Sequence, residues 1–167
     1  MESLSREESE AILKRNEIGR LGCFSPSANA TYVVPISYEY AHGAVFFACL
    51  PGLKLAYLVE HPEGVCLEVE EVDAEQNWDT VLVIGTYTRL TGHEQLLRWL
   101  PAIGRVGRGP LRTLFHAQAA AASGAELVLC ALRPTSISGR RDRWMPQQPQ
   151  PPAAQREARA ELAQKRH

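Results

Sequence analysis

The fold is decided by residues 31–49, which read TYVVPISYEYAHGAVFFAC. Over residues 31–40, large apolar side chains alternate with smaller or more polar ones, which is typical of a strand with one buried face. The side chains on that face belong to Tyr32, Val34, Ile36, Tyr38 and Tyr40. His42 and Gly43 then mark a tight turn, and residues 44–49 form a second apolar strand. We therefore predict a β-hairpin.

A short helix is predicted after the hairpin, over residues 54–60, between a Pro-Gly pair and a His-Pro pair that stops it. Lys54 lies in its first turn, where the helix dipole favours anions rather than cations. A solvated surface lysine is the simpler interpretation of this residue alone. A phosphate held between the ammonium group and the free backbone N–H groups is the functional one. Pro35 removes a donor from the first strand, so we expect it at a sheet edge, at a bulge or beside a cavity.

Four more strands and three more helices are expected along the chain. The strands occupy residues 18–24, 65–70, 80–90 and 126–132, with Gly85 as a natural bend in the third of these. The helices are one that opens at a capping box of Ser5 and Glu8, one over residues 94–100 and one over residues 111–122. The strands follow one another as hairpins and not as βαβ units. We therefore predict a mainly β (α+β) protein, a six-stranded antiparallel barrel with short flanking helices.

Length and charge limit the organisation of the chain. Its 167 residues, 45% of them hydrophobic, can bury one core, so we expect a domain at residues 1–145. Residues 146–167 are expected to form a Pro/Gln linker and a polar helix or tail. Residues 133–167 hold eight Lys/Arg and three Asp/Glu, a surplus of +5, so the net charge of −1 leaves −6 on residues 1–132. An acidic body argues against nucleic acid as the main ligand.

The cysteines and the apolar segments indicate the compartment. Cys23, Cys49, Cys66 and Cys130 stand far apart in apolar runs, without the spacing of a metal site. We expect them to be reduced core residues and expect no metal. The N-terminus lacks an apolar leader segment, and no apolar run approaches the length of a membrane span. A cytoplasmic protein without membrane contact is therefore predicted.

Side chains that could carry chemistry on their own are few. Glu68 and Glu70 lie on one face of a strand, and with Glu71 they suggest paired acids, but a solvated strand face explains them without catalysis. The glycine-rich segment at residues 104–110 holds two arginines, yet a connection between helices is a better interpretation than an anion cradle. No candidate nucleophile has a base near it in the sequence. The catalytic residues stay unknown, and any chemistry must come from a cofactor.

Taken in order, several motifs resemble the FMN-binding split-barrel superfamily, the group related to pyridoxamine 5′-phosphate oxidase. The nitroimidazole-reductase-like branch is the most similar part of that group. The motifs are YVVPISY at residues 32–38, GAVFF at 43–47, GLK at 52–54, HP at 61–62, VCLEV at 65–69 and WDTVLVIGT at 78–86. The resemblance covers most of the chain between Leu4 and Arg141 and implies a six-stranded antiparallel split β-barrel.

The resemblance also implies a cofactor site. FMN is expected in a groove between two identical subunits, so the expected partner is a second copy of the chain. The residues that line the isoalloxazine would be Val33, Val34, Pro35, Ile36 and Ser37, and those beside the ribityl chain would be Phe47, Ala48 and Cys49. Lys54 would hold the phosphate together with the N–H groups that follow Gly52, from Leu53 onward. Trp78 and Trp144 would reach in from the partner subunit.

Three positions depart from the pattern of the group. Many relatives have Ser or Thr at the position of Ala48 and Arg or Lys at that of Leu53, and the nitroimidazole-reductase-like branch commonly has His at that of Phe47. Each lost bond to a phosphate removes ~1.5–3 kcal/mol. Two such losses weaken binding ~100-fold or more. We therefore expect FMN to be weakly bound.

The expected function is a homodimeric FMN-dependent oxidoreductase. It would pass reducing equivalents from NAD(P)H to a small planar acceptor such as a nitroaromatic or a quinone. An alternative is a non-catalytic split barrel that binds haem, deazaflavin or another ligand, or none. A third interpretation treats the dimer and the tail as an interaction platform. Lys54 and the strand at residues 33–37 favour the enzyme, whereas Phe47, Ala48 and Leu53 favour the binding protein.

Overall fold

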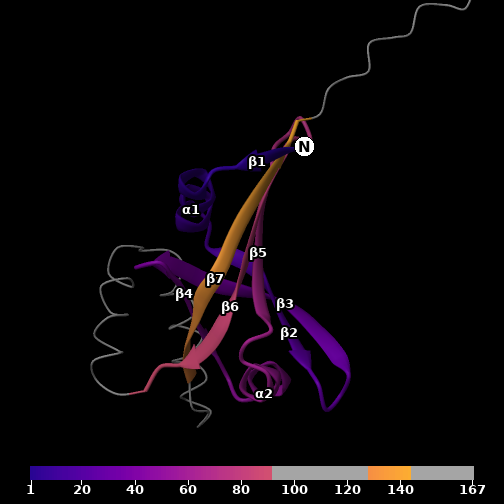
Figure 1. The fold of residues 1–167 in the computed structure, drawn as a ribbon, viewed down its shortest axis with the longest axis vertical. Helices are drawn as coiled ribbons and strands as arrows, with labels where there is room; N and C mark the ends of the chain where they lie inside the picture. Colours follow the sequence, from indigo (N-terminus) through magenta and orange to yellow (C-terminus); the bar gives the residue numbers. More distant parts are fainter. Residues whose placement is uncertain (92–127, 144–167) are drawn as a thin grey trace, which may run out of the picture.

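Seven antiparallel strands wrap into a barrel in the computed structural model, which describes residues 1–91 and 128–143 (Figure 1). Their spatial order is β1-β7-β4-β3-β2-β5-β6, and pairing between β6 and β7 closes the ring. The strands are β1 Glu2–Leu4, β2 Ile18–Ser25, β3 Ala30–Ala41, β4 Ala44–Cys49, β5 Val65–Val72, β6 Trp78–Arg89 and β7 Val128–Asp142. The predicted six-stranded, mainly β antiparallel barrel is confirmed, with β1 as an extra short strand on β7.

The β3–β4 hairpin forms as predicted. His42 and Gly43 both have positive φ, 51° and 74°, and they join the Ala41–Ala44 pair as a two-residue loop. Positive φ at both loop positions is the geometry that matches the twist of paired strands. The expected alternation is present as well, since Tyr38 is 2% exposed whereas Val33 is 58% exposed.

The last strand is much longer than predicted. The sequence indicated a strand over residues 126–132, but β7 continues to Asp142, because β6 pairs with it from Trp78 to Arg89. Pro134 lies within β7 at an irregularity opposite Gly85, where the register shifts, so the ladder resumes beyond the proline. The register shift therefore falls at Gly85, the position at which the sequence predicted a bend.

Other predicted boundaries need correction or stay predictions. β6 begins at Trp78 and not at residue 80 as predicted, and the pairing of β1 with residues 139–141 of β7 was not predicted. The predicted helices at residues 94–100 and 111–122, the segment at 104–110 and the tail at 146–167 lie outside the described residues. The proposed domain boundary at residue 145 stays a prediction.

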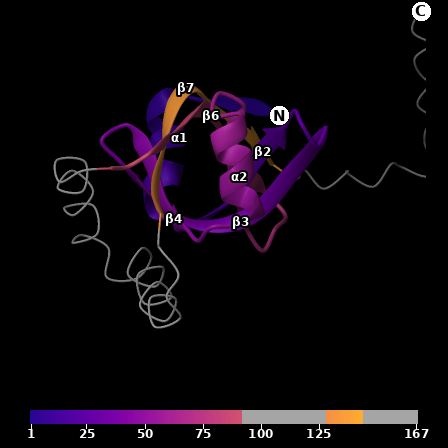
Figure 2. The ribbon, with the colours of Figure 1, turned by 90° about the horizontal axis from the view of Figure 1, so that it is seen from below.

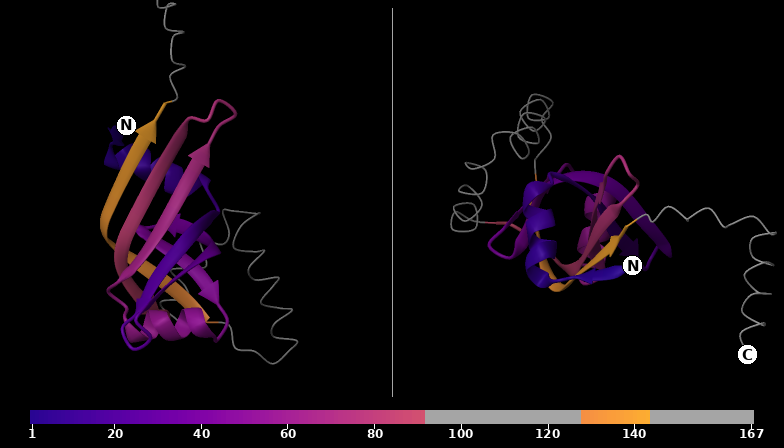
Figure 3. Two further views of the ribbon diagram at one scale, coloured as in Figure 1. Left: turned by 90° about the vertical axis from the view of Figure 1, so that its right-hand side faces the viewer. Right: turned by 90° about the horizontal axis from the view of Figure 1, so that it is seen from above.

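In the described part of the chain, two helices lie at the barrel ends. Helix α1, Arg6–Arg15, has the predicted capping box, in which the Glu8 N–H donates to Ser5 Oγ at 3.1 Å and the Ser5 N–H donates to Glu8 Oε2 at 2.8 Å. Helix α2, Leu53–Glu60, crosses the opposite end of the barrel (Figures 2 and 3). Both helices bury apolar side chains in the barrel core, Leu13 and Leu58 being fully buried. Neither of these helices is long and apolar enough to cross a membrane, nor is any other helix within residues 1–91 and 128–143.

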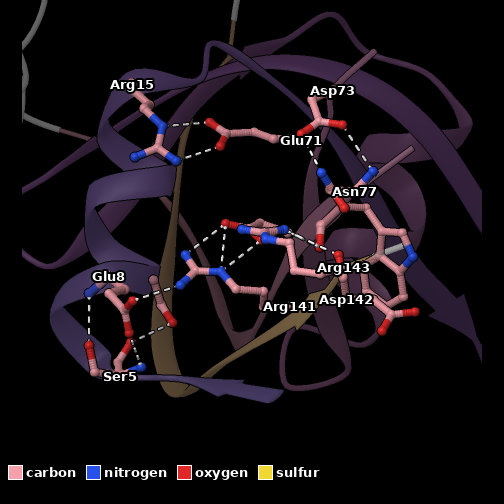
Figure 4. A network of polar contacts seen from close by, with 12 residues as sticks. Ser5, Glu8, Arg15, Glu71, Asp73, Asn77, Arg141, Asp142 and Arg143 are labelled. Atoms are coloured by element: carbon pink, nitrogen blue, oxygen red, sulfur yellow. Dashed lines mark hydrogen bonds and ion pairs between the residues drawn. The ribbon is translucent and has the colours of Figure 1, made fainter. Parts of the chain in front are cut away.

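A polar network joins the strand ends to α1 (Figure 4). Asp79, which is 7% exposed, accepts a bond from Arg141 Nη2 at 2.9 Å and pairs with Arg143 at 2.8 Å. Arg141 also pairs with Glu8 of α1 at 3.1 Å. The hydrogen bond from Arg141 holds the pKa of the Asp79 carboxyl below its usual range. The network therefore ties the far end of β7 to β6 and to the N-terminal helix.

We expect Asp79→Asn to lower the free energy of unfolding at pH 7 by about 2 kcal/mol, because charged hydrogen bonds are lost. The pKa of Asp79 is depressed in the folded protein, so its stabilising effect is present above the unfolded value near ~3.9 and is lost as pH falls further. The gap between wild type and variant should therefore close in acid. Urea unfolding at several pH values measures it, with Glu7→Gln, which changes an exposed carboxylate on α1, as the control. A gap that persists at low pH would contradict this account.

We expect Gly85→Ala to destabilise the barrel by about 1–3 kcal/mol, since a Cβ must force backbone apart. An added Cβ at residue 85 would lie 2.2 Å from the carbonyl oxygen of Arg133 and 3.0 Å from Cα of Pro134. The matched control is Gly52→Ala, because an added Cβ there meets nothing within 4 Å. Urea unfolding of the two variants compares them, and equal stability would refute the close approach at Gly85.

Candidate functional site

Lys54 lies in the first turn of α2, as predicted. Gly52 caps this helix without a side-chain hydrogen bond, and the first helical bond runs from the Ala56 N–H to the Gly52 carbonyl at 3.0 Å. The N–H groups of the first turn therefore lack helical partners. The Lys54 side chain is half-buried, and within residues 1–91 and 128–143 it has no hydrogen bond or ion pair. A half-buried cation without an acidic partner, next to free N–H groups, suits an anion.

The charge of Lys54 acts toward the barrel interior. Burial raises the pKa of the Cys23 thiol, and the Lys54 charge opposes that rise. The same charge favours the thiolates of Cys49 and Cys130, although other groups dominate their pKa values. The charge of Lys54 thus acts on three thiols, which belong to β2, β4 and β7. Helix α2 itself covers one end of the barrel that these strands help to form (Figure 2).

Helix α2 is fastened at its C-terminal end. Glu60 accepts from Ser25 Oγ at 2.6 Å and from the Ser27 N–H at 2.8 Å, and Ser25 is fully buried. A carboxylate at this end is disfavoured by the helix dipole, and the donors of the β2–β3 turn offset that cost. The hydrogen bond from Ser25 is the main reason why the pKa of Glu60 is lowered. Sequence reasoning missed this contact because its partners stand 35 positions apart.

Ring contacts place the lysine helix beside β3. Tyr57 of α2 meets Tyr32 of β3 edge to face, with ring centroids 6.1 Å apart. His61 meets Phe24 of β2 in the same way at 6.2 Å. The start of β3 and the phosphate-binding candidate are therefore held against each other within one chain.

The first half of β3 forms an open edge. β4 pairs with β3 only from Tyr38 to Ala41, so among the described residues the segment 30–37 has a partner on one side only, namely β2. Pro35 lies in this segment, opposite Arg20 of β2, which confirms the expectation of a sheet edge. Backbone groups on the unpaired side are available to a ligand.

The residues predicted to line a flavin divide into two sets. Val33 and Pro35 are exposed and Ser37 is half-buried on the outer face of β3, whereas Val34 and Ile36 pack toward the core. On β4, Ala48 is half-buried, but Phe47 and Cys49 are core side chains at 2% and 3% exposure. The inward residues can therefore offer only backbone to a ligand on this face.

A shallow depression of about 490 Å³ lies beside the open edge and is lined in part by Ile18, Arg20, Pro35 and Glu70. Arg20 pairs with Glu68 at 3.0 Å and with Glu70 at 2.6 Å. Glu71 pairs with Arg15. These ion pairs agree with the interpretation of the strand carboxylates as a solvated face rather than as paired catalytic acids.

One predicted residue, Trp78, is not brought to Lys54 within the chain. Trp78 begins β6 opposite Val72, at the barrel end away from α2 (Figure 1). Trp144 lies outside the described residues. The single chain therefore assembles the α2 N-terminus and the β3 edge, and the contribution of the two tryptophans to a partner's site stays a prediction.

Comparison with known proteins gives the class. The chain belongs to the pyridoxamine 5′-phosphate oxidase family, whose model matches residues 5–141. An FAD-binding protein of Mesorhizobium loti has a similar structure, with a TM-score of 0.66 and 26% identity over 84% of this chain and 95% of that one. The FAD-binding protein of Mycobacterium smegmatis shares the fold, with a TM-score of 0.63 and 22% identity over 85% of this chain and 100% of that one.

A relative without assigned function is also similar in sequence. An uncharacterised protein of Rhizobium meliloti strain 1021 is 28% identical over 101 residues. The match covers 58% of this chain and 65% of that relative's length. The family membership thus confirms the split-barrel resemblance seen in the sequence motifs.

We expect Glu60→Gln to loosen α2, because an amide replaces the carboxylate that accepts from Ser25 and Ser27. Hydrogen exchange of the α2 amides should become faster than in wild type, while that of the β5–β6 ladder stays unchanged. Glu63→Gln is the matched control, since Glu63 is exposed just beyond the same helix. If both variants exchange at the wild-type rate, the fastening at Glu60 does not hold the helix.

Proposed function

We propose that the protein is a homodimeric, flavin-dependent oxidoreductase with FMN as its first candidate cofactor. The observation that carries the proposal is Lys54, a half-buried cation without a described partner, beside the free amides of the α2 N-terminus. A phosphoryl group satisfies both sets of donors. The similar proteins from Mesorhizobium loti and Mycobacterium smegmatis bind FAD according to their names, which supports a flavin.

The open edge of β3 fits the flavin ring system. An isoalloxazine carries hydrogen-bonding groups on one edge and flat apolar faces, and the segment 33–37 offers unpaired backbone together with the exposed side chains of Val33 and Pro35. When bound, a flavin supplies the hydride chemistry for which no side chain is a convincing candidate. The residues of this chain would bind the phosphate, orient the ring and exclude water.

A second copy of the chain is proposed to complete the groove. Val33 is 58% exposed and Ile18 is 65% exposed, and both lie on the outer face where β2 and β3 pair. Burying these apolar side chains against a second subunit would remove them from water, which is favourable. Trp78 and Trp144 would be contributed by the other subunit. NAD(P)H as the donor, a nitroaromatic or quinone as the acceptor, and a cytoplasmic location stay part of this proposal.

Absorbance and reduction test the enzyme proposal directly. We expect the purified protein, after incubation with FMN and removal of free ligand, to show a flavin spectrum that NADH or NADPH bleaches anaerobically and a nitroaromatic or quinone restores. FAD is tested in parallel, because it shares the ring and a phosphate. Bound flavin that neither nicotinamide reduces would favour a non-catalytic binding protein. A haem or deazaflavin spectrum in the purified protein would assign a different ligand.

We expect Lys54→Ala to weaken FMN binding by about 10–100-fold, since a charged bond to phosphate is worth ~1.5–3 kcal/mol. Lys54→Arg should keep most of the affinity, because it retains the charge. Lys14→Ala is the matched control, as Lys14 is an exposed lysine on α1. Titration by quenching of flavin fluorescence measures the dissociation constants of wild type and the three variants, and a wild-type value for Lys54→Ala would contradict the phosphate site.

A further inference from the structure

Two buried thiols face each other inside the barrel, and the proposed flavin site uses neither of their side chains. Sγ of Cys49 and Sγ of Cys130 lie 3.6 Å apart, and the residues are 3% and 0% exposed. Cys49 ends β4, and Cys130 lies in β7 near its start. Both cysteines are free. The sequence interpretation of these cysteines as reduced core residues is confirmed for this pair, and folding also brings the two thiols together.

The strand register explains how the thiols meet. Cys49 is opposite Val128 and Cys130 is opposite Phe47, so the two cysteines are diagonal neighbours on the inward face of the β4–β7 ladder. Among the described residues, the Cys49–Val128 pair is the last of that ladder, and β4 ends at Cys49. End pairs of a ladder open at lower free-energy cost than central pairs. A disulfide needs a sulfur separation of about 2.05 Å, so the thiols must approach by roughly 1.5 Å, and the end of a ladder can yield that movement.

The surroundings make the two thiols unequal. A hydrogen bond with Cys130 lowers the pKa of the Cys49 thiol, burial opposes that change, and the charges of Lys54 and Arg89 add to the lowering. The same bond with Cys49 raises the pKa of Cys130, and burial raises it further. Cys130 also contacts the Tyr87 hydroxyl at 3.9 Å. Thiolate character therefore belongs to Cys49, and thiolates are the nucleophiles in thiol oxidation.

We propose that Cys49 and Cys130 form a redox-active dithiol that a peroxide converts into a disulfide linking β4 to β7. The Cys49 thiolate attacks one peroxide oxygen, the O–O bond breaks, and Cys49 becomes a sulfenic acid while the leaving oxygen takes a proton to form water. Cys130 Sγ then attacks the Cys49 sulfur, its thiol proton goes to the departing hydroxyl, and a second water leaves. Both thiols together lose two electrons, and the hydrogen peroxide gains them.

The location of the pair couples it to the anion site. Cys49 is followed by the exposed segment 50–52, which leads directly into the first turn of α2 and Lys54. A covalent link at Cys49 fixes the start of this segment to β7. Oxidation of the two thiols does not require a bound flavin. The test of the disulfide can therefore fail while the test of flavin binding succeeds, and the reverse.

Thiol counting on the full chain tests the proposal. The protein is treated with hydrogen peroxide, the oxidant is removed with catalase, and the chain is denatured, alkylated with iodoacetamide and digested. We expect the alkylated thiols per chain to fall from the four present in the sequence to two, at Cys23 and Cys66, with a Cys49–Cys130 linked peptide in the mass spectrum. Dithiothreitol should restore all four.

Single variants separate this pair from general oxidation. Cys49→Ser and Cys130→Ser should each abolish the linked peptide, while Cys66→Ser, which changes a half-buried thiol outside the pair, should retain it. If a variant does not fold, the presence or absence of the Cys49–Cys130 linked peptide in the wild-type protein decides the proposal. Four alkylated thiols after peroxide, a disulfide that involves Cys23 or Cys66, or sulfinic acid at Cys49 without a linked peptide would each overturn the proposal.

Discussion

The point at which β4 stops pairing with β3 is the constraint on which the rest of the structure depends. Four pairs, from Tyr38–Phe47 to Ala41–Ala44, hold the hairpin together, and then the two strands diverge. β4 continues along β7, whereas the first half of β3 stays with β2. The divergence leaves the Val33-to-Ser37 edge without a strand partner among the described residues. A proline is tolerated in this segment, because an edge strand needs fewer backbone donors than a strand that is paired on both sides.

Helix α2 places a candidate anion site beside the open edge of β3. It follows β4 after a short turn, closes the barrel end with Leu58, and is fastened by Glu60 to the turn that leads into β3. The short connection to β4 at one end of α2 and the Glu60 contacts at the other restrict where the first turn, and with it Lys54, can lie. A half-buried ammonium group loses hydration and has no described carboxylate to compensate for it. The arrangement is therefore expected to gain from an anionic ligand.

A feature could be predicted from the sequence when the residues that form it lie close together along the chain. The capping box at Ser5, the turn at His42 and the helical placement of Lys54 each depend on neighbours within a few positions, and all three were predicted correctly. The length of β7 was not, because Pro134 and Gly139 interrupt its local pattern and β6 supplies the ladder. The Asp79–Arg141 bond spans 62 positions and the Cys49–Cys130 contact spans 81, so no local pattern reveals either.

The central claim is that Lys54 and the α2 amides grip a phosphoryl group. Comparing FMN with riboflavin tests it most directly, because the two ligands differ only in that group. Isothermal titration of the wild-type protein with both ligands gives the ratio of their dissociation constants. We predict FMN to bind at least about tenfold more tightly, the equivalent of roughly 1.4 kcal/mol. Equal affinities for FMN and riboflavin would contradict a phosphate site at this helix.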